Sequence, residues 1–283
     1  MDNHPPIFPK IAIIGAGQMG RGIANLCLQH GLSVYLLDNH QGNLDASLER
    51  IKQKHQGNLP KNLSFGLDIN KIADADLIIE AIPEIEAEKK NLFQSIAGLI
   101  KEKAIIATNS SSISITRLAA SSGRSGQFCG MHFMNPVSAM PLVELVRGLA
   151  TQDEVFETCA SFVTSIGKEY AESQDFPGFI VNRVLVPMIN EAIYALYEGV
   201  GNVATIDRAI RLGASHPQGP LQLADFIGLD NILAILSTLY NDLADNKYRP
   251  CPLLLKYVEA GWLGIKVGRG FYDYGSNPPQ PTR

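Results

Sequence analysis

The sequence predicts an α/β protein in which a doubly wound, mostly parallel sheet is followed by an all-helical C-terminal domain. The chain opens with a strand, a glycine-rich turn and a helix over residues 10–38. Short apolar runs then alternate with amphipathic segments, which is typical of parallel strands joined by helical crossovers. After residue 177 only helical patterns follow, so we expect two domains, at residues 1–177 and 178–283.

The first unit has the pattern of a dinucleotide-binding loop. The apolar run Lys10–Gly15 predicts a buried strand, and Met19–His30 predicts the helix that follows it. Glycines in the spacing G-x-G-x-x-G let the backbone approach a pyrophosphate, and the helix N-terminus offers N–H groups to it. A strand before, a helix after and an acidic residue about 20 positions on are the context that this motif requires. We therefore predict a Rossmann-type domain whose cofactor turn contains Gly15, Gly17, Gln18, Met19 and Gly20.

The identity of the dinucleotide is predicted by Asp38, which ends the second apolar run, Ser33–Leu37. A carboxylate at this position can accept hydrogen bonds from the ribose hydroxyls, and it would repel a 2′-phosphate. The sequence therefore favours NAD over NADP.

The remaining elements follow from hydrophobic periodicity and turn residues. In the first domain we expect further strands at Leu63–Leu67, Asp76–Ile79, Ala104–Thr108, Phe128–Phe133 and Leu142–Val146, with a last one beginning near Lys168–Ala171. Between them we expect helices at Asn43–Gln56, Ala87–Leu99, Ile115–Ser121 and Asp153–Ile166. The second domain has helical patterns at Phe179–Glu198 (with a bend near Pro187), Val203–Leu212, Pro220–Phe226, Leu229–Leu243 and Pro252–Ala260, and we expect the Pro-rich end, Ser276–Arg283, to be frayed.

Composition and charge argue against nucleic acid, membranes and metal ions as partners. The 283 residues are 46% hydrophobic and 18% charged with a net charge of −4, so no basic field attracts nucleic acid or anionic membrane. The N-terminal stretch MDNHPPIFPK lacks the pattern of a signal peptide, and no apolar run has the length of a membrane span. The four cysteines lie far apart without a CxxC pair, so we expect reduced thiols, a cytoplasmic location and no metal site.

Two residues could carry acid–base chemistry. His132 stands at the carboxyl end of the strand Phe128–Phe133, the edge where ligands bind in open α/β sheets. Glu144 lies among apolar neighbours in PLVELV, where a carboxylate is costly unless it is paired. A pair between them would orient the imidazole and stabilise its protonated form. The alternatives are a satisfied core histidine and a glutamate on the solvated face of an edge strand.

Two polar positions could hold a substrate. Ser111 follows the strand Ala104–Thr108, and its hydroxyl could donate to a substrate oxygen; Asn109, just before it, is suitably placed for the cofactor. Asn182 lies in PGFIVNR, at the start of a long apolar helix. The Ser/Asn-rich turn could equally cap the next helix, and Asn182 could equally make an interhelix hydrogen bond.

Together these segments resemble the 3-hydroxyacyl-CoA dehydrogenase family, and among its members the bacterial enzymes specific for 3-hydroxybutyryl-CoA. The resemblance extends over nearly the whole chain, in the order GAGQMG, IIEAIPE, ATNSSSISI, GMHFMNPV, LVELVRG, PGFIVNR, HPQGPLQLADFIGLD and AGWLGIKVGRGFYDY. It implies NAD-dependent, reversible oxidation of an L-3-hydroxyacyl-CoA, with the acyl-CoA bound between the domains and a homodimer formed through the helical domain.

The resemblance also implies a role for individual residues. The catalytic histidine falls on His132, its partner on Glu144, and the substrate contacts on Ser111 and Asn182. On the cofactor side it implies Asp38, Glu84, Lys89, Asn135 and Lys266. Ser47 and Lys54 stand at positions that resemble CoA contacts.

One departure leaves the substrate carrier open. Family members have a longer helical pair between Asp38 and Asp76, whereas this chain passes quickly through Gly57–Asn70. The lysines of this region could contact CoA phosphates or form a solvated face. The alternatives are therefore a dehydrogenase acting on an acyl-carrier-protein thioester or a free hydroxy acid, or a non-catalytic dinucleotide-binding protein.

Overall fold

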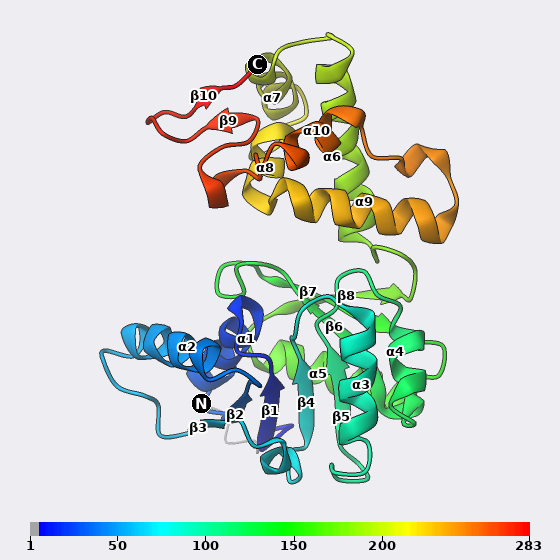
Figure 1. Ribbon diagram of the computed structural model, residues 1–283. Coiled ribbons are helices and arrows are strands. Elements are labelled where there is room, and N and C mark those ends of the chain that lie inside the picture. Colours follow the sequence, from blue (N-terminus) through cyan, green and yellow to red (C-terminus); the bar gives the residue numbers. More distant parts are fainter. Residues whose placement is uncertain (1–5) are drawn as a thin grey trace. The chain divides into compact units, whose positions relative to one another are not determined.

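The computed structural model describes residues 6–283 and divides into two compact units. The first unit ends at Phe179 and the second begins at Ile180, two residues beyond the end of the first domain as placed from the sequence. Each unit has its own apolar core. The predicted architecture is confirmed: an α/β unit with a mostly parallel sheet is followed by a helical unit (Figure 1).

The first unit is built on one eight-stranded sheet in the order β3-β2-β1-β4-β5-β6-β7-β8. Neighbouring strands are parallel except β6 and β7, which are antiparallel. The strands are β1 (Lys10–Ile14), β2 (Ser33–Leu37), β3 (Leu63–Gly66), β4 (Leu77–Glu80), β5 (Ile105–Thr108), β6 (Phe128–Phe133), β7 (Leu142–Arg147) and β8 (Glu169–Gln174).

Alternation along the strands explains how helices cover both faces of the sheet. In β1, Ile11 and Ile13 belong to one core cluster while Ala12 and Ile14 belong to the other, because successive side chains point to opposite faces. The first cluster packs against α1 (Gln18–Gln29), α2 (Gln41–Lys54) and α5 (Asp153–Ser165). The second packs against α3 (Glu86–Ile96) and α4 (Ile115–Ser121), and Figure 1 shows these two helices side by side.

The region between β2 and β4 is as brief as the sequence predicts. After α2 the chain forms only the edge strand β3 and the short 3-10 helix η1 (Ile69–Ile72). Every helix and strand that the sequence predicts is present, and where the ends differ they do so by one to three residues, which is normal for element termini.

The second unit packs helices around a separate core that includes Ile189, Leu221 and Leu236. Its helices are α6 (Val181–Tyr197), α7 (Val203–Gly213), α8 (Pro220–Ile227), α9 (Leu229–Leu243) and α10 (Pro252–Glu259), with short 3-10 helices η3 (Asn246–Tyr248) and η4 (Ile265–Val267). Pro187 lies inside α6. Within residues 6–283 no single helix is long and apolar enough to cross a membrane, although α8 and α9, bent by 96°, pass that test as a pair.

The end of the chain corrects one expectation. Ser276–Arg283 is not frayed, because β10 (Gln280–Pro281) pairs with β9 (Tyr272–Asp273) and the Thr282 N–H donates to the Phe271 carbonyl at 2.9 Å. Compositional bias toward proline predicted fraying, but these backbone hydrogen bonds and the buried Phe271 ring hold the segment.

Asp225 anchors the preceding loop to the helical unit. Its carboxylate accepts from the backbone N–H groups of Phe271 and Tyr272, both at 2.9 Å, and from the Tyr274 hydroxyl at 3.0 Å. Gly270 approaches so closely that a Cβ there would lie 1.9 Å from Asp225 Oδ1. Burial raises the pKa of Asp225 to about 6 in spite of these donors.

Candidate active site

The antiparallel pair β6–β7 brings His132 and Glu144 into contact. The register of the two strands places them directly opposite each other, and His132 Nδ1 lies 2.8 Å from Glu144 Oε2. Glu144 is fully buried and His132 is 8% exposed, so the contact is shielded from solvent. Cross-strand neighbours on one face of a sheet meet in this way, and the pairing predicted from the cost of a buried carboxylate is present.

This geometry fixes the tautomer of the imidazole. A carboxylate can only accept hydrogen bonds, so Nδ1 carries the proton shared with Glu144 and the lone pair is on Nε2. The ring is also held from the side by Phe179, whose centroid is 5.9 Å away. The arrangement is suited to taking a proton at Nε2 while Glu144 stabilises the resulting imidazolium.

A serine-rich turn after β5 lies beside this edge of the sheet and is organised by Glu84. Glu84 Oε1 accepts from Ser110 Oγ at 2.6 Å, from the Ser111 N–H at 2.9 Å and from the Ser112 N–H at 3.0 Å. Burial alone would raise the pKa of Glu84, but nearby Lys89 and these donors outweigh it, and the net pKa is lowered. Ser111, the predicted substrate contact, is thus held by a residue that the sequence placed on the cofactor side.

A buried ion pair beneath this turn was not predicted. Glu80 ends β4 with no exposed surface, and its carboxylate accepts from Lys89 Nζ at 2.5 Å and from Thr108 Oγ1 at 2.5 Å. Lys89 is 1% exposed and also donates to the Ile82 carbonyl at 3.2 Å. It therefore supports the turn in this structure, and its contact with a cofactor stays a prediction. The pattern IIE followed by a lysine nine residues later was the available signal.

Two asparagines join segments at the carboxyl ends of the strands. Asn109 Oδ1 accepts from the Phe133 N–H at 2.9 Å, which joins the ends of β5 and β6. Asn135 Oδ1 accepts from Gln18 Nε2 at 2.9 Å, which joins the loop after β6 to the first turn of α1. Gln18 and Asn135, predicted for the cofactor from distant parts of the sequence, are therefore neighbours.

The glycine turn has the close approaches that the motif requires. Gly15 has φ +105°, and a Cβ on Gly20 would lie 1.8 Å from the Gly15 carbonyl oxygen, so neither position admits a side chain. A Cβ on Gly17 would meet nothing within 4 Å, which leaves that side of the turn open for a ligand. Met19 follows in the first turn of α1 and packs against the core.

Asp38 borders the glycine turn after β2. Its Oδ2 accepts from the Ala16 N–H at 2.7 Å, and its Oδ1 accepts from the His40 N–H at 2.9 Å. The carboxylate is thus oriented by backbone donors at the place where an adenosine ribose is expected.

The predicted CoA contacts differ in exposure. Ser47 is 1% exposed, and its hydroxyl donates to the Ala16 carbonyl, so it packs α2 against the glycine turn in place of presenting a hydroxyl to substrate. The sequence could not show this, because a serine on a helix gives no sign of which way its hydroxyl is used. Lys54 ends α2 and is exposed. Its contact with substrate stays a prediction.

Asn182 and Lys266 belong to the helical unit. Asn182 lies in the first turn of α6, and Lys266 lies in η4, where its ammonium contacts Asp230 Oδ1 at 2.6 Å. Their parts in binding stay predictions.

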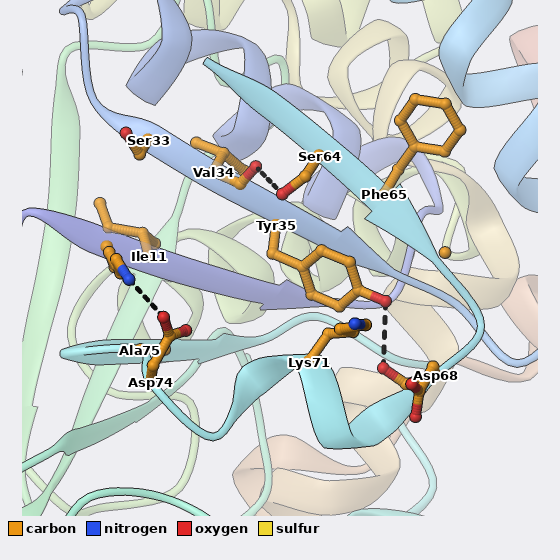
Figure 2. Close-up of a pocket in the computed structure, with 12 residues that line it drawn as sticks. Ile11, Ser33, Val34, Tyr35, Ser64, Phe65, Asp68, Lys71, Asp74 and Ala75 are labelled. Carbon is orange, nitrogen blue, oxygen red and sulfur yellow. Dashed lines mark hydrogen bonds and ion pairs between the residues drawn. The ribbon is translucent and has the colours of Figure 1, made fainter.

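A cavity of about 530 Å³ lies elsewhere on the first unit (Figure 2). It is lined from β1, β2, β3 and η1, and Figure 2 shows the Tyr35 hydroxyl donating to the Asp68 carbonyl on one side of it. None of the predicted site residues lines it.

Among residues 6–283 all four cysteines are buried free thiols, and no group of three or more His, Cys, Asp or Glu is placed to hold a metal ion.

Comparison with known proteins relates both units of the chain to one family. The model of the 3-hydroxyacyl-CoA dehydrogenase NAD-binding domain matches residues 10–176, and that of the C-terminal domain matches residues 178–274. A 3-hydroxybutyryl-CoA dehydrogenase of Bradyrhizobium diazoefficiens is 51% identical, covering 98% of this chain and 99% of its own length. A probable 3-hydroxybutyryl-CoA dehydrogenase of Bacillus subtilis is 46% identical, covering 94% and 97%. The crystal structure of (S)-3-hydroxybutyryl-CoA dehydrogenase from Ralstonia eutropha is 40% identical with a TM-score of 0.89, covering 95% of this chain and 100% of that one. With both domain models matched in order and such identity over nearly the full length, the chain belongs to the 3-hydroxyacyl-CoA dehydrogenase family.

Proposed function

We propose that the protein catalyses the reversible NAD-dependent oxidation of an L-3-hydroxyacyl-CoA to the 3-oxoacyl-CoA, with 3-hydroxybutyryl-CoA as the substrate. The observation that carries the proposal is the buried contact between His132 and Glu144 at 2.8 Å, in a chain of this family. The names of the relatives support the short acyl chain and the CoA thioester.

The residues around the glycine turn fit NAD. The open side of Gly17, the N-terminus of α1 and the oriented carboxylate of Asp38 form a cradle for a dinucleotide without a 2′-phosphate. Asn135 and Gln18 would hold it from the opposite side. When bound, NAD accepts the hydride from C3 of the substrate.

In the proposed mechanism His132 Nε2 removes the proton of the 3-hydroxyl group. The positive charge that develops on the imidazole is stabilised by Glu144, which holds Nδ1 in a water-excluded contact. Ser111 and Asn182 hold the substrate oxygens. In the reverse direction the imidazolium returns the proton to the 3-oxo group.

The carrier is tested by comparing initial rates of NADH oxidation with acetoacetyl-CoA, the acetoacetyl-carrier protein and free acetoacetate. We expect a strong preference for the CoA thioester, with exposed Lys54 as a phosphate contact. The short region from α2 to η1 favours the alternatives, and a preference for either other substrate would overturn the CoA assignment. No oxidation of NADH with any of the three would favour a non-catalytic dinucleotide-binding protein.

We further propose that the protein acts as a homodimer in the cytoplasm, with the helical unit forming the interface. The exposed apolar side chains of that unit, which include Val184, Tyr197 and Val200, support this assembly. Four buried free thiols fit a reducing compartment.

A further inference from the structure

Lys168 is a buried cation to which neither the proposed mechanism nor the predicted site assigns a role. It lies in the turn between α5 and β8, is 9% exposed, and its ammonium donates to the Val137 carbonyl at 2.7 Å and the Met140 carbonyl at 2.8 Å. Burial of an ammonium group is costly, and its hydrogen bonds to the two carbonyls offset part of that cost. The role of Lys168 is therefore to be sought in the two carbonyls that its ammonium group holds.

The two carbonyls belong to the loop that connects β6 to β7. Within this loop the N–H groups of Ala139 and Met140 both donate to the Pro136 carbonyl at 3.0 Å, forming a single tight turn. The N–H groups of the turn donate to the Pro136 carbonyl and not to those of Val137 and Met140, and Lys168 supplies a donor to each of these two.

The other side of the same turn contacts the cofactor helix. Val137 packs against Gly22 of α1 so closely that a Cβ on Gly22 would lie 2.9 Å from Val137 Cγ2. One residue before the turn, Asn135 accepts from Gln18 in the first turn of α1 at 2.9 Å. Lys168 therefore fixes the segment that carries Asn135 against the helix that follows the glycine turn.

We propose that Lys168 is a positioning residue for dinucleotide binding: by holding the Val137 and Met140 carbonyls, it sets the place of Asn135 beside Gln18 at the mouth of the cofactor site. The proposal rests on the proposed function only in that the ligand is NAD. The reacting pair is unaffected, because the β6–β7 ladder and not the loop pairs His132 with Glu144.

The test is a fluorescence titration of the whole protein with NADH, comparing wild type with Lys168→Met. We expect the Kd to rise about tenfold, since two buried carbonyls lose their donor and the turn relaxes. The kcat with acetoacetyl-CoA at saturating NADH should stay within about threefold. Lys103→Met is the matched control, because Lys103 is an exposed lysine of the same unit and should leave the Kd unchanged.

A double-mutant cycle separates positioning from a general structural role. If Lys168 acts through Asn135, the variant carrying both Lys168→Met and Asn135→Ala should bind NADH no more weakly than the weaker-binding single variant. Kd changes that multiply, or a fall in thermal stability with an unchanged Kd, would overturn the proposal.

Lys168→Gln keeps an uncharged, shorter amide donor near the two carbonyls and serves if the Met variant does not fold. We expect a smaller rise in Kd, and an unchanged Kd in the folded variant would also overturn the proposal. The titration needs no turnover, so a wild type that binds NADH but leaves acetoacetyl-CoA unchanged would count against the proposed function alone.

Discussion

At the scale of single residues, the proposed mechanism assigns proton transfer to His132 and Glu144, and cofactor binding to other residues. Glu144 fixes Nδ1, which leaves Nε2 as the only ring nitrogen that can take a proton. Neither side chain lines the glycine turn. Substitutions at the pair should therefore change the chemical step while the affinity for dinucleotide stays.

Replacing His132 with Gln tests this separation directly. Gln can occupy similar volume but cannot accept the proton, so we expect kcat to fall at least about 100-fold, the usual contribution of a general base. The Kd for NADH should change less than about twofold. Steady-state rates with acetoacetyl-CoA and an NADH titration measure both values, and near-normal turnover would remove His132 from the mechanism.

The lowered pKa of Glu84 predicts how the stability of the protein depends on pH. Its pKa is lowered below the ordinary 4.5, because Lys89 and the donors of Ser110–Ser112 outweigh the effect of burial. A lowered folded-state pKa adds stability that is present above about pH 4.5 and is lost as the pH falls through the folded-state value. The Glu84→Gln variant lacks this contribution.

We expect Glu84→Gln to lower the free energy of unfolding by about 1 kcal/mol at pH 7, discounted because the side chain is 35% exposed. The difference from wild type should shrink as the pH falls below about 4.5. Urea unfolding at several pH values measures it, with Glu88→Gln as a control at an exposed position in the helix that follows, α3. A difference that is constant with pH would contradict the ionic role.

At the scale of elements, Gly17 and Gly20 at the start of α1 are expected to be needed for different reasons. A Cβ on Gly20 would lie 1.8 Å from the Gly15 carbonyl oxygen, whereas a Cβ on Gly17 would meet nothing within 4 Å. Gly20 is therefore required by the fold, whereas nothing in the fold requires a glycine at position 17, and the requirement there is proposed to come from the dinucleotide.

Alanine at each position should separate the two requirements. Gly20→Ala should destabilise the protein by about 1–3 kcal/mol through overpacking and should weaken NADH binding. Gly17→Ala should leave the melting temperature within about 1 °C and raise the Kd for NADH, because only the pyrophosphate path is blocked. Thermal melts and NADH titrations of both variants check this, and equal loss of stability in the two would contradict it.

Most helices and strands could be predicted from the sequence, because the periodicity of hydrophobic residues and the spacing of glycines are local signals. The strand–turn–helix unit and the pairing of His132 with Glu144 follow from apolar runs and from the cost of a buried charge. The Glu80–Lys89 ion pair and the inward hydroxyl of Ser47 could not, since they depend on which elements become neighbours. The ordered chain end was missed because strand pairing with Tyr272 outweighs a Pro-rich composition.

At the scale of the whole molecule, the assembly state is open to test. Val184 on α6 is 68% exposed, and Tyr197 and Val200 of the same unit are also exposed apolar side chains. If the helical unit forms the dimer, Val184→Asp should shift the protein toward monomer at micromolar concentration, because a charge would be buried at the interface. Analytical ultracentrifugation measures the shift, with exposed Leu149→Asp in the first unit as a control. A monomeric wild type would contradict the proposal.

The antiparallel pairing of β6 and β7 has a consequence for the evolution of the sequence. His132 and Glu144 are matched by ladder register, whereas the loop between their strands contacts α1 through Asn135 and Val137. Insertions in residues 136–140 would preserve the His132–Glu144 match, while a one-residue insertion inside either strand would reverse every side chain beyond it. The residues proposed for dinucleotide binding and those proposed for proton transfer can therefore diverge independently within one hairpin.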